Sequence, residues 1–121
     1  MTGVFFDEIN EKVIRLMADE PLRRKAEKIC IKMPEDDVSE ELFGTPVIVE
    51  ITGYGNDGKN EGVVCRLQSP KPEMQKILKS VRRPTITLSL SEEGNYADTQ
   101  NLEFKDFRIP YVCKGVFERC E

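Results

Sequence analysis

The sequence predicts an α+β domain: a small, mostly antiparallel β-barrel or sandwich with an N-terminal helix and a short inserted helix. Three observations support this fold class. Apolar residues recur at helical spacing near the N-terminus, alternate with polar residues in several later segments, and return to helical spacing once after Pro72. The 121 residues suffice for a single domain. Within it we expect an N-terminal helical segment with an acidic connector over residues 1–42, and the barrel or sandwich over residues 43–121.

The N-terminal helix is predicted by apolar residues three or four positions apart, with negative charge near its start that suits the helix dipole. The apolar positions are Phe5, Ile9, Val13, Leu16 and Met17. We expect the stripe of Phe5, Ile9, Val13 and Leu16 to pack on the sheet. The alternative is that it docks against a neighbouring subunit, and these four residues are therefore our candidates for a ring interface.

The segment after Pro21 gives a weaker pattern. Residues 22–28 suit one or two further helical turns, whereas residues 29–33 alternate in a way that suits a short strand as well as a helix end. Residues 34–41 are acidic and expected to be irregular.

A hairpin is expected next, because the periodicity changes to two. Val47, Val49 and Ile51 alternate with other residues from Pro46 on, and the alternation resumes at residues 63–67. The intervening residues 53–62 are expected to form a long, mobile tip.

The remaining elements are a helix and three strands. Pro72 opens a short helix, because proline is favoured at the first helical position. Residues 85–90 alternate most clearly of all and predict a strand after Pro84. A last hairpin is expected from a strand at residues 102–104, a turn near residues 105–106 and a return over residues 107–113.

Charge and cysteine content exclude several functions. The chain has 18 basic and 22 acidic residues, a net charge of −4, which argues against a protein whose main task is to grip phosphate backbones. The basic pairs Arg23-Arg24 and Arg82-Arg83 are too few to make such a surface. There is no histidine, and Cys30, Cys65, Cys113 and Cys120 form no C-x-x-C pair, so we expect buried free thiols and no metal site.

No feature of the sequence points to a membrane or to secretion. No apolar run approaches the roughly 20 residues of a membrane span, and the N-terminus lacks the basic start and apolar stretch of a secretory signal. We therefore expect an intracellular protein without membrane partners.

Catalytic motifs are weak. Residues 53–58 match G-x-G-x-x-G after a predicted strand, but the following residues predict a turn and a strand rather than the helix that a dinucleotide site needs. Without histidine or a nucleophile-elbow motif, we expect no enzyme and no cofactor. The acidic runs at residues 35–37 and 92–93 are interpreted as solvated surface. A hydrolase using two carboxylates stays open, although no motif indicates one.

Five short motifs, read in order, resemble the small head–tail joining proteins of long-tailed double-stranded DNA phages, also called head-completion or stopper proteins. They are Phe43-Gly44-Thr45-Pro46-Val47, Gly62-Val63-Val64, Arg83-Pro84-Thr85-Ile86-Thr87-Leu88, Leu102-Glu103-Phe104 and Tyr111-Val112. The resemblance spans residues 43–116. The chain departs from that family where its last hairpin lacks a turn glycine, and where it ends soon after residue 117.

The resemblance implies a structural virion protein, made in the host cytoplasm and then assembled at the portal and its adaptor as a ring, usually a hexamer. The ring would retain packaged DNA, which passes without sequence-specific binding, and would dock the tail terminator. Candidate channel or docking residues come from the predicted loop and the helical insert: Tyr54, Asn56, Asp57, Lys59, Lys71, Gln75 and Lys79. The main alternative is a small acidic inhibitory or protein-binding module outside the virion. A nucleic-acid-binding barrel and an enzyme are the remaining alternatives.

Overall fold

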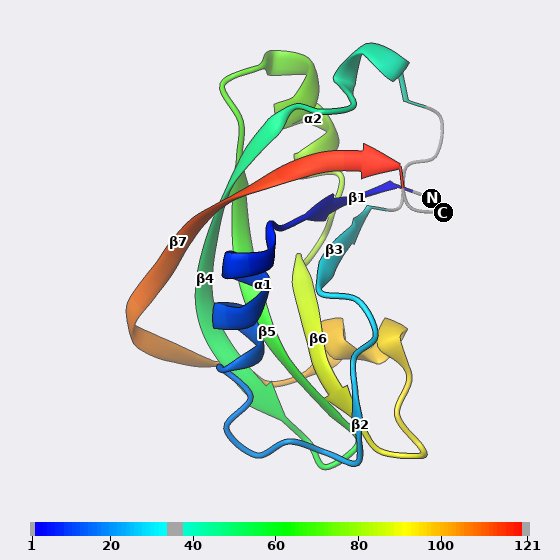
Figure 1. Ribbon diagram of the computed structural model, residues 1–121, viewed down its shortest axis with the longest axis vertical. Coiled ribbons are helices and arrows are strands. Elements are labelled where there is room, and N and C mark those ends of the chain that lie inside the picture. The colour runs from blue at the N-terminus through cyan, green and yellow to red at the C-terminus, as the bar shows by residue number, and fades with distance from the viewer. Residues whose placement is uncertain (1, 34–37, 120–121) are drawn as a thin grey trace.

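The computed structural model describes residues 2–33 and 38–119. These residues form one antiparallel seven-stranded sheet in the order β2-β6-β5-β4-β7-β1-β3. The sheet is strongly curved, so that β3 at one edge approaches β6 near the other edge and an incomplete barrel results (Figure 1). The predicted α+β fold class is confirmed. The elements are β1 (Thr2–Phe5), α1 (Glu8–Arg15), β2 (Arg24–Lys25), β3 (Cys30–Met33), the 3-10 turn η1 (Glu40–Leu42), β4 (Pro46–Asn56), β5 (Asn60–Gln68), α2 (Pro72–Lys79), β6 (Thr85–Leu90), the 3-10 turn η2 (Tyr96–Asn101) and β7 (Lys105–Arg119).

The N-terminal helix begins later than its apolar pattern predicts. The Asp7 Oδ1 atom accepts a hydrogen bond from the backbone N–H of Asn10 at 2.7 Å and so caps α1 at Glu8. Phe5 therefore lies in β1, where it is opposite Cys30 of β3 and Val116 of β7. A four-residue strand was missed because its apolar residues also fit the helical spacing.

The inward face of α1 also differs from the prediction. Ile14 is fully buried, whereas Ile9 and Leu16 are 75% and 83% exposed. The expectation that the stripe packs on the sheet is therefore wrong for these two residues. The inward face includes Asn10, one turn before Ile14, and the Tyr111 hydroxyl bonds its side-chain oxygen at 2.6 Å. Because Asn10 is polar, the apolar pattern alone did not place it on the inward side of the helix.

The helical turns expected over residues 22–28 are wrong. The segment is extended, with β2 paired to β6 and the Ala26 N–H donating to the Leu88 carbonyl at 3.0 Å. The Leu22 N–H is bound by the Ser89 hydroxyl at 2.9 Å. Of the two alternatives for residues 29–33, the structure has the strand, β3. Residues 34–37 of the acidic segment lie outside the described residues.

The β4–β5 hairpin is confirmed, but the expectation of a long tip is wrong. Both strands continue almost to the turn at residues 57–59. The Asp57 Oδ1 atom accepts from the N–H groups of Lys59 and Asn60, both at 2.8 Å, and Gly58 takes a positive φ of 84°. Glycine suits that angle because it has no Cβ. No helix begins at the glycines of the G-x-G-x-x-G match.

The later helix and strand are confirmed as α2 and β6, but the last hairpin is wrong. Residues 102–104 are not a strand, and β7 is one long strand paired with β4 and β1. The residues from Phe107 to Pro110 stand opposite Thr52 alone and form a bulge in β7. Pro110 has no N–H to donate, so an unpaired bulge position suits it.

The core fills the barrel and joins both helices to it. Phe117 is the largest fully buried side chain, and its ring stacks on that of Phe43 with centroids 5.5 Å apart. Besides Phe117, the core cluster contains Val4, Ile14, Ile29, Ile31, Val47, Val49, Ile51, Val63, Met74, Leu78, Ile86 and Leu88. Burial of this apolar surface is the main stabilising contribution to the fold.

Candidate functional site

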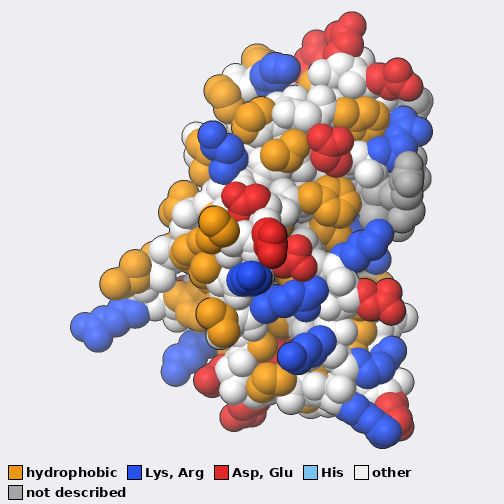
Figure 2. Space-filling model, in the orientation of Figure 1, with side chains coloured by type: hydrophobic (Ala, Val, Ile, Leu, Met, Phe, Trp, Pro, Cys, Tyr) orange, Lys and Arg blue, Asp and Glu red, His pale blue; other side chains and the backbone are white. Residues whose placement is uncertain are grey.

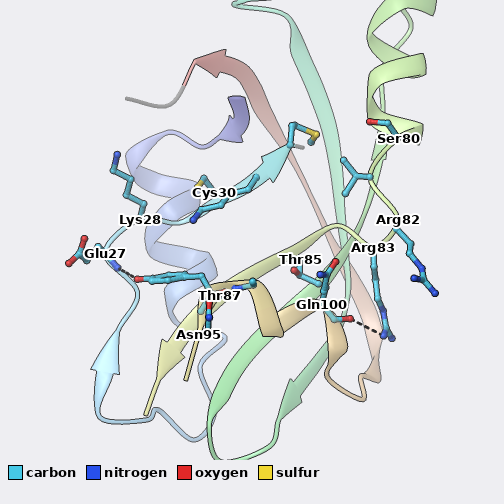
Figure 3. Close-up of a pocket in the computed structure, with 15 residues that line it drawn as sticks. Glu27, Lys28, Cys30, Ser80, Arg82, Arg83, Thr85, Thr87, Asn95 and Gln100 are labelled. Carbon is cyan, nitrogen blue, oxygen red and sulfur yellow. Dashed lines mark hydrogen bonds between the residues drawn. The ribbon is translucent and has the colours of Figure 1, made fainter. Parts of the chain in front are cut away.

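A groove of about 950 Å³ lies where β3 and β6 diverge at the open seam of the barrel (Figure 3). Cys30 and Lys32 line one side, and Thr85 and Thr87 line the other. In each strand these residues alternate with core residues such as Ile31 and Ile86, so the groove is on the outer surface of the barrel. We call it the seam groove.

The seam opens because the backbone after β2 is held by side chains instead of by β6. The Arg15 guanidinium donates from Nη1 to the Ala26 carbonyl at 2.8 Å and from Nη2 to the Glu27 carbonyl at 3.3 Å. The Glu27 N–H donates to the Tyr96 hydroxyl at 3.1 Å (Figure 3). The chain then leaves β6, and β3 pairs with β1.

This divergence leaves an open edge on β6. The Pro84 carbonyl accepts from the Cys65 N–H at 2.9 Å and therefore points to β5. Alternation along an antiparallel strand then turns the backbone N–H and C=O groups of Thr85 and Thr87 toward the seam. Within the described chain, the two residues are paired with β5 residues and with no strand on their other side.

The third wall of the seam groove is η2, which a buried polar cluster fixes to β5 and β6. The Asn60 side chain is 1% exposed and donates to the Asn95 carbonyl at 2.6 Å and to the Thr99 hydroxyl at 2.8 Å. Thr99 in turn shares a hydrogen bond of 2.6 Å with Thr87. Because buried polar groups that are fully bonded are rigid, Tyr96 at the start of η2 is held in place.

The seam groove is basic although the chain as a whole is acidic. Its lining includes Lys28, Lys32, Arg82 and Arg83, with Glu27 as the acidic residue. Among the described residues, Lys32, Arg82 and Arg83 have no carboxylate partner. Because Glu27 is the one carboxylate among the described lining residues, Lys32, Arg82 and Arg83 create a local positive potential.

Contacts on the groove walls orient two of these cations. The Lys32 Nζ atom lies 5.0 Å from the centre of the Tyr96 ring. The Arg83 Nη1 atom donates to the Gln100 carbonyl at 3.2 Å, and the guanidinium carbon is 4.7 Å from the centre of the Phe104 ring. Figure 3 shows Arg82 and Arg83 side by side at one end of the groove. Cation–π contacts of this kind fix a positive charge without neutralising it.

A second surface is apolar and lies over α1 and the bulge of β7. Ile9 and Leu16 on α1 are exposed, as is Ile109 in the bulge at 81%. The bond between Asn10 and Tyr111 joins the two elements. Figure 2 shows hydrophobic side chains gathered over α1 and at the projecting bend of β7. We call Ile9, Leu16 and Ile109 the apolar face.

The structure places the candidate ring-interface residues in different settings. Ile9 and Leu16 belong to the apolar face, Val13 beside them is half-buried, and Phe5 lies in β1. The candidate stripe is therefore one surface only in part.

The channel or docking candidates fall into two groups at opposite ends of the barrel (Figure 1). Tyr54 and Asn56 are in β4, and Asp57 and Lys59 form the turn after it. The other group is at α2: Lys71 occupies the N-cap position without a capping side-chain bond, Gln75 accepts from the Ser69 N–H at 2.9 Å, and Lys79 is exposed.

Tyr54 is half-buried because it belongs to a network around Glu61. The Glu61 carboxylate is fully buried and accepts hydrogen bonds from the Tyr54 hydroxyl at 2.5 Å, the Ser89 hydroxyl at 2.6 Å and the Glu20 N–H at 3.0 Å. Burial, and then the bond to Glu61, raise the pKa of Tyr54. The donors come from β4, from β6 and from the segment at residue 20, so the Glu61 carboxylate joins these three segments to β5.

The cysteines vary in exposure. Cys30 and Cys65 are buried, and Cys113 is half-buried; Cys120 is outside the described residues. Cys65 and Cys113 are free thiols, as predicted. Burial raises the pKa of Cys65 well above its usual range, and burial with the nearby Asp7 charge raises that of Cys113 to about 11. Both thiols are therefore protonated and unreactive near neutral pH.

Sequence reasoning missed the seam groove. Lys28 and Lys32 alternate with the buried residues Ile29 and Ile31, a pattern that predicts basic side chains on the outer face of a strand. The Arg82-Arg83 pair was visible, but its position opposite β3 depends on how the sheet closes. For Tyr96, the sequence contains no comparable signal.

No family model, curated protein or solved structure matches the chain. Among the described residues, no three or more Cys, Asp or Glu side chains are grouped as a metal site. The helices in the same part of the chain lack the length and apolar character needed to cross a membrane.

Proposed function

We propose that this protein is a non-enzymatic structural subunit that joins the DNA-filled head of a long-tailed phage to its tail, assembled as a ring. The observation that supports this function best is the apolar face. Exposed apolar residues scattered singly need no explanation, but Ile9, Leu16 and Ile109 project from two adjoining elements. Exposed patches of this kind mark contacts between proteins.

The shape of the molecule is also suited to a connector. A subunit between the head and the tail needs contact surfaces at two opposite ends. The turn at Asp57 and the helix α2 occupy opposite ends of the barrel, and the apolar face lies between them on its side (Figures 1 and 2). In this proposal the apolar face contacts the next subunit of the ring, while the two ends contact the adaptor and the tail terminator.

Cryo-electron microscopy of particles carrying the protein tests this function. We expect a ring of copies between portal and tail. The double variant Ile9→Lys and Leu16→Lys should fold, because both side chains are exposed, yet fail to enter the particle. The control is Glu8→Lys, which introduces the same residue on the same helix and costs little, since it removes an exposed ion pair with Lys12 and one favourable charge at the helix start.

The control variant should be incorporated as the wild type is. Absence of the wild-type protein from particles would overturn the proposal. The second candidate, a protein-binding module acting outside the virion, would then lead, because the seam groove offers a binding surface that does not involve the apolar face.

A further inference from the structure

We propose that the seam groove binds an extended acidic peptide of another protein, which pairs with the open edge of β6. This inference goes beyond the connector function and uses different residues. The first support is the backbone. Thr85 and Thr87 each direct one N–H and one C=O toward the seam, and the neighbouring segment leaves β6 after Ala26. An unpaired edge of this kind is a template for an added strand.

The geometry of the seam explains why the protein itself does not fill that edge. Arg15 and Tyr96 hold the backbone at Ala26 and Glu27, so the chain cannot continue along β6. The edge and the groove beside it are therefore built by fixed contacts. A peptide entering from the side of Arg82 would lie along β6 at the end of the seam where β3 has diverged from it.

The charges define the peptide. Lys32 is on the β3 side, and Arg82 and Arg83 stand at the end of the groove near Thr85. These three cations have no carboxylate partner among the described residues. A strand with acidic side chains on the face that meets them would supply the missing partners, while its main chain pairs with Thr85 and Thr87.

Single-stranded nucleic acid is the competing class of ligand and is disfavoured on two grounds. Binding of that kind relies on open aromatic faces for base stacking, and the ring of Tyr96 already has Lys32 against it. The chain also carries a net charge of −4, which opposes a polyanion at long range. A short acidic peptide is less affected because it carries fewer charges.

A displayed library of random short peptides, selected on the immobilised full chain, tests the proposal. We expect enrichment of acidic sequences with β-branched residues at alternate positions. The double variant Lys32→Glu and Arg82→Glu should weaken the selected peptides by about tenfold or more. Both side chains are exposed, and Arg83 keeps its bond to Gln100 in this variant.

Two matched controls separate local from general charge effects. Lys105→Glu with Lys114→Glu makes the same charge change on exposed positions of β7 and should leave binding unchanged. Lys32→Arg with Arg82→Lys keeps the groove charge and should retain binding. Amide shifts on titration with the selected peptide should centre on Thr85 and Thr87.

Three results would overturn the proposal. The first is that the library enriches no sequence on the wild-type chain over the groove variant. The second is that peptides are enriched but bind the groove variant equally well. The third is that a poly-dT oligonucleotide binds the groove more tightly than the selected peptides. N-methylation of alternate peptide amides supplies a further criterion: unchanged affinity in every methylation register would exclude strand pairing.

Discussion

At the scale of single residues, the least expected feature is Glu61, a fully buried carboxylate that has no basic partner within residues 2–33 and 38–119. Its cost of desolvation is offset by hydrogen bonds from Tyr54, Ser89 and the Glu20 backbone. The sequence places Glu61 in an expected mobile tip, because glycines and polar residues surround it. The network is consistent with a short tip, because Tyr54 in β4 and Glu61 in β5 lie close enough to bond only if both strands continue toward the turn.

Replacing Glu61 with leucine should destabilise the protein by about 3 kcal/mol, because three donors lose their acceptor in a buried site. Tyr54→Phe removes one donor and leaves the others paired, so its expected cost is about 1 kcal/mol. Urea unfolding of both variants measures these differences. A Glu61→Leu variant no less stable than Tyr54→Phe would contradict the assigned role of the network.

Because of Asp57, the free energy of unfolding should depend on pH in the acidic range. Bonds from the N–H groups of Asn60 and Lys59 lower its pKa below the ordinary value of 3.8. A carboxyl whose pKa is lower in the folded state stabilises the protein above pH 3.8, and that stabilisation disappears as the pH falls through the lowered value.

The comparison for this effect is Asp57→Asn, which keeps an oxygen acceptor but has no charge. The wild type should be the more stable protein at neutral pH, by less than about 1 kcal/mol because the site is exposed. The difference in the free energy of unfolding between the two proteins should shrink as the pH falls below the ordinary carboxyl range. Denaturation curves over a series of pH values measure it, and a gap that is constant with pH would count against the linkage.

At the scale of elements, the sequence analysis correctly predicted those elements whose signals lie within a few neighbouring residues. The strand β6 and the helix α2 were predicted at or near their true bounds, because alternation, helical spacing and flanking prolines are local signals. The predicted hairpin at residues 102–113 was wrong because β7 pairs with β4 on both sides of its bulge and has no turn near residue 105. The seam groove needs three segments, β3, β6 and η2, whose meeting depends on sheet closure.

The helix α1 gives the sharpest test of orientation at this scale. Ile14→Ala should cost about 3 kcal/mol because the side chain is fully buried, whereas Leu16→Ala should change stability by less than about 0.5 kcal/mol. Helix propensity acts against this difference, since Ile→Ala within α1 gains more propensity than Leu→Ala at its C-cap. Thermal or urea unfolding decides the matter, and similar losses for the two variants would mean that α1 is turned differently on the sheet.

At the scale of the whole molecule, the two ends of the chain are joined through the sheet. The strand β1 lies between β7 and β3, and it links β3 to the other strands. Val4 is directly opposite Phe117, and both side chains are fully buried. Folding of the barrel therefore requires contacts between residues that are far apart in the sequence, and contacts of this kind slow folding.

A double-mutant cycle on Val4 and Phe117 tests this joining of the chain ends. Val4→Ala and Phe117→Leu should each cost about 1–2 kcal/mol, and their effects should be non-additive by about 1 kcal/mol, because opposite side chains on paired strands share contacts. Val4→Ala with Leu90→Ala is the control pair, since Leu90 is buried but is not part of the same core cluster. Its two effects should add.

Additive effects in the Val4 and Phe117 pair would mean that β1 and β7 do not act as one unit in stabilising the barrel. In that case β3, which reaches the sheet through β1, could detach without unfolding the rest, and the seam would be a mobile boundary rather than a fixed groove.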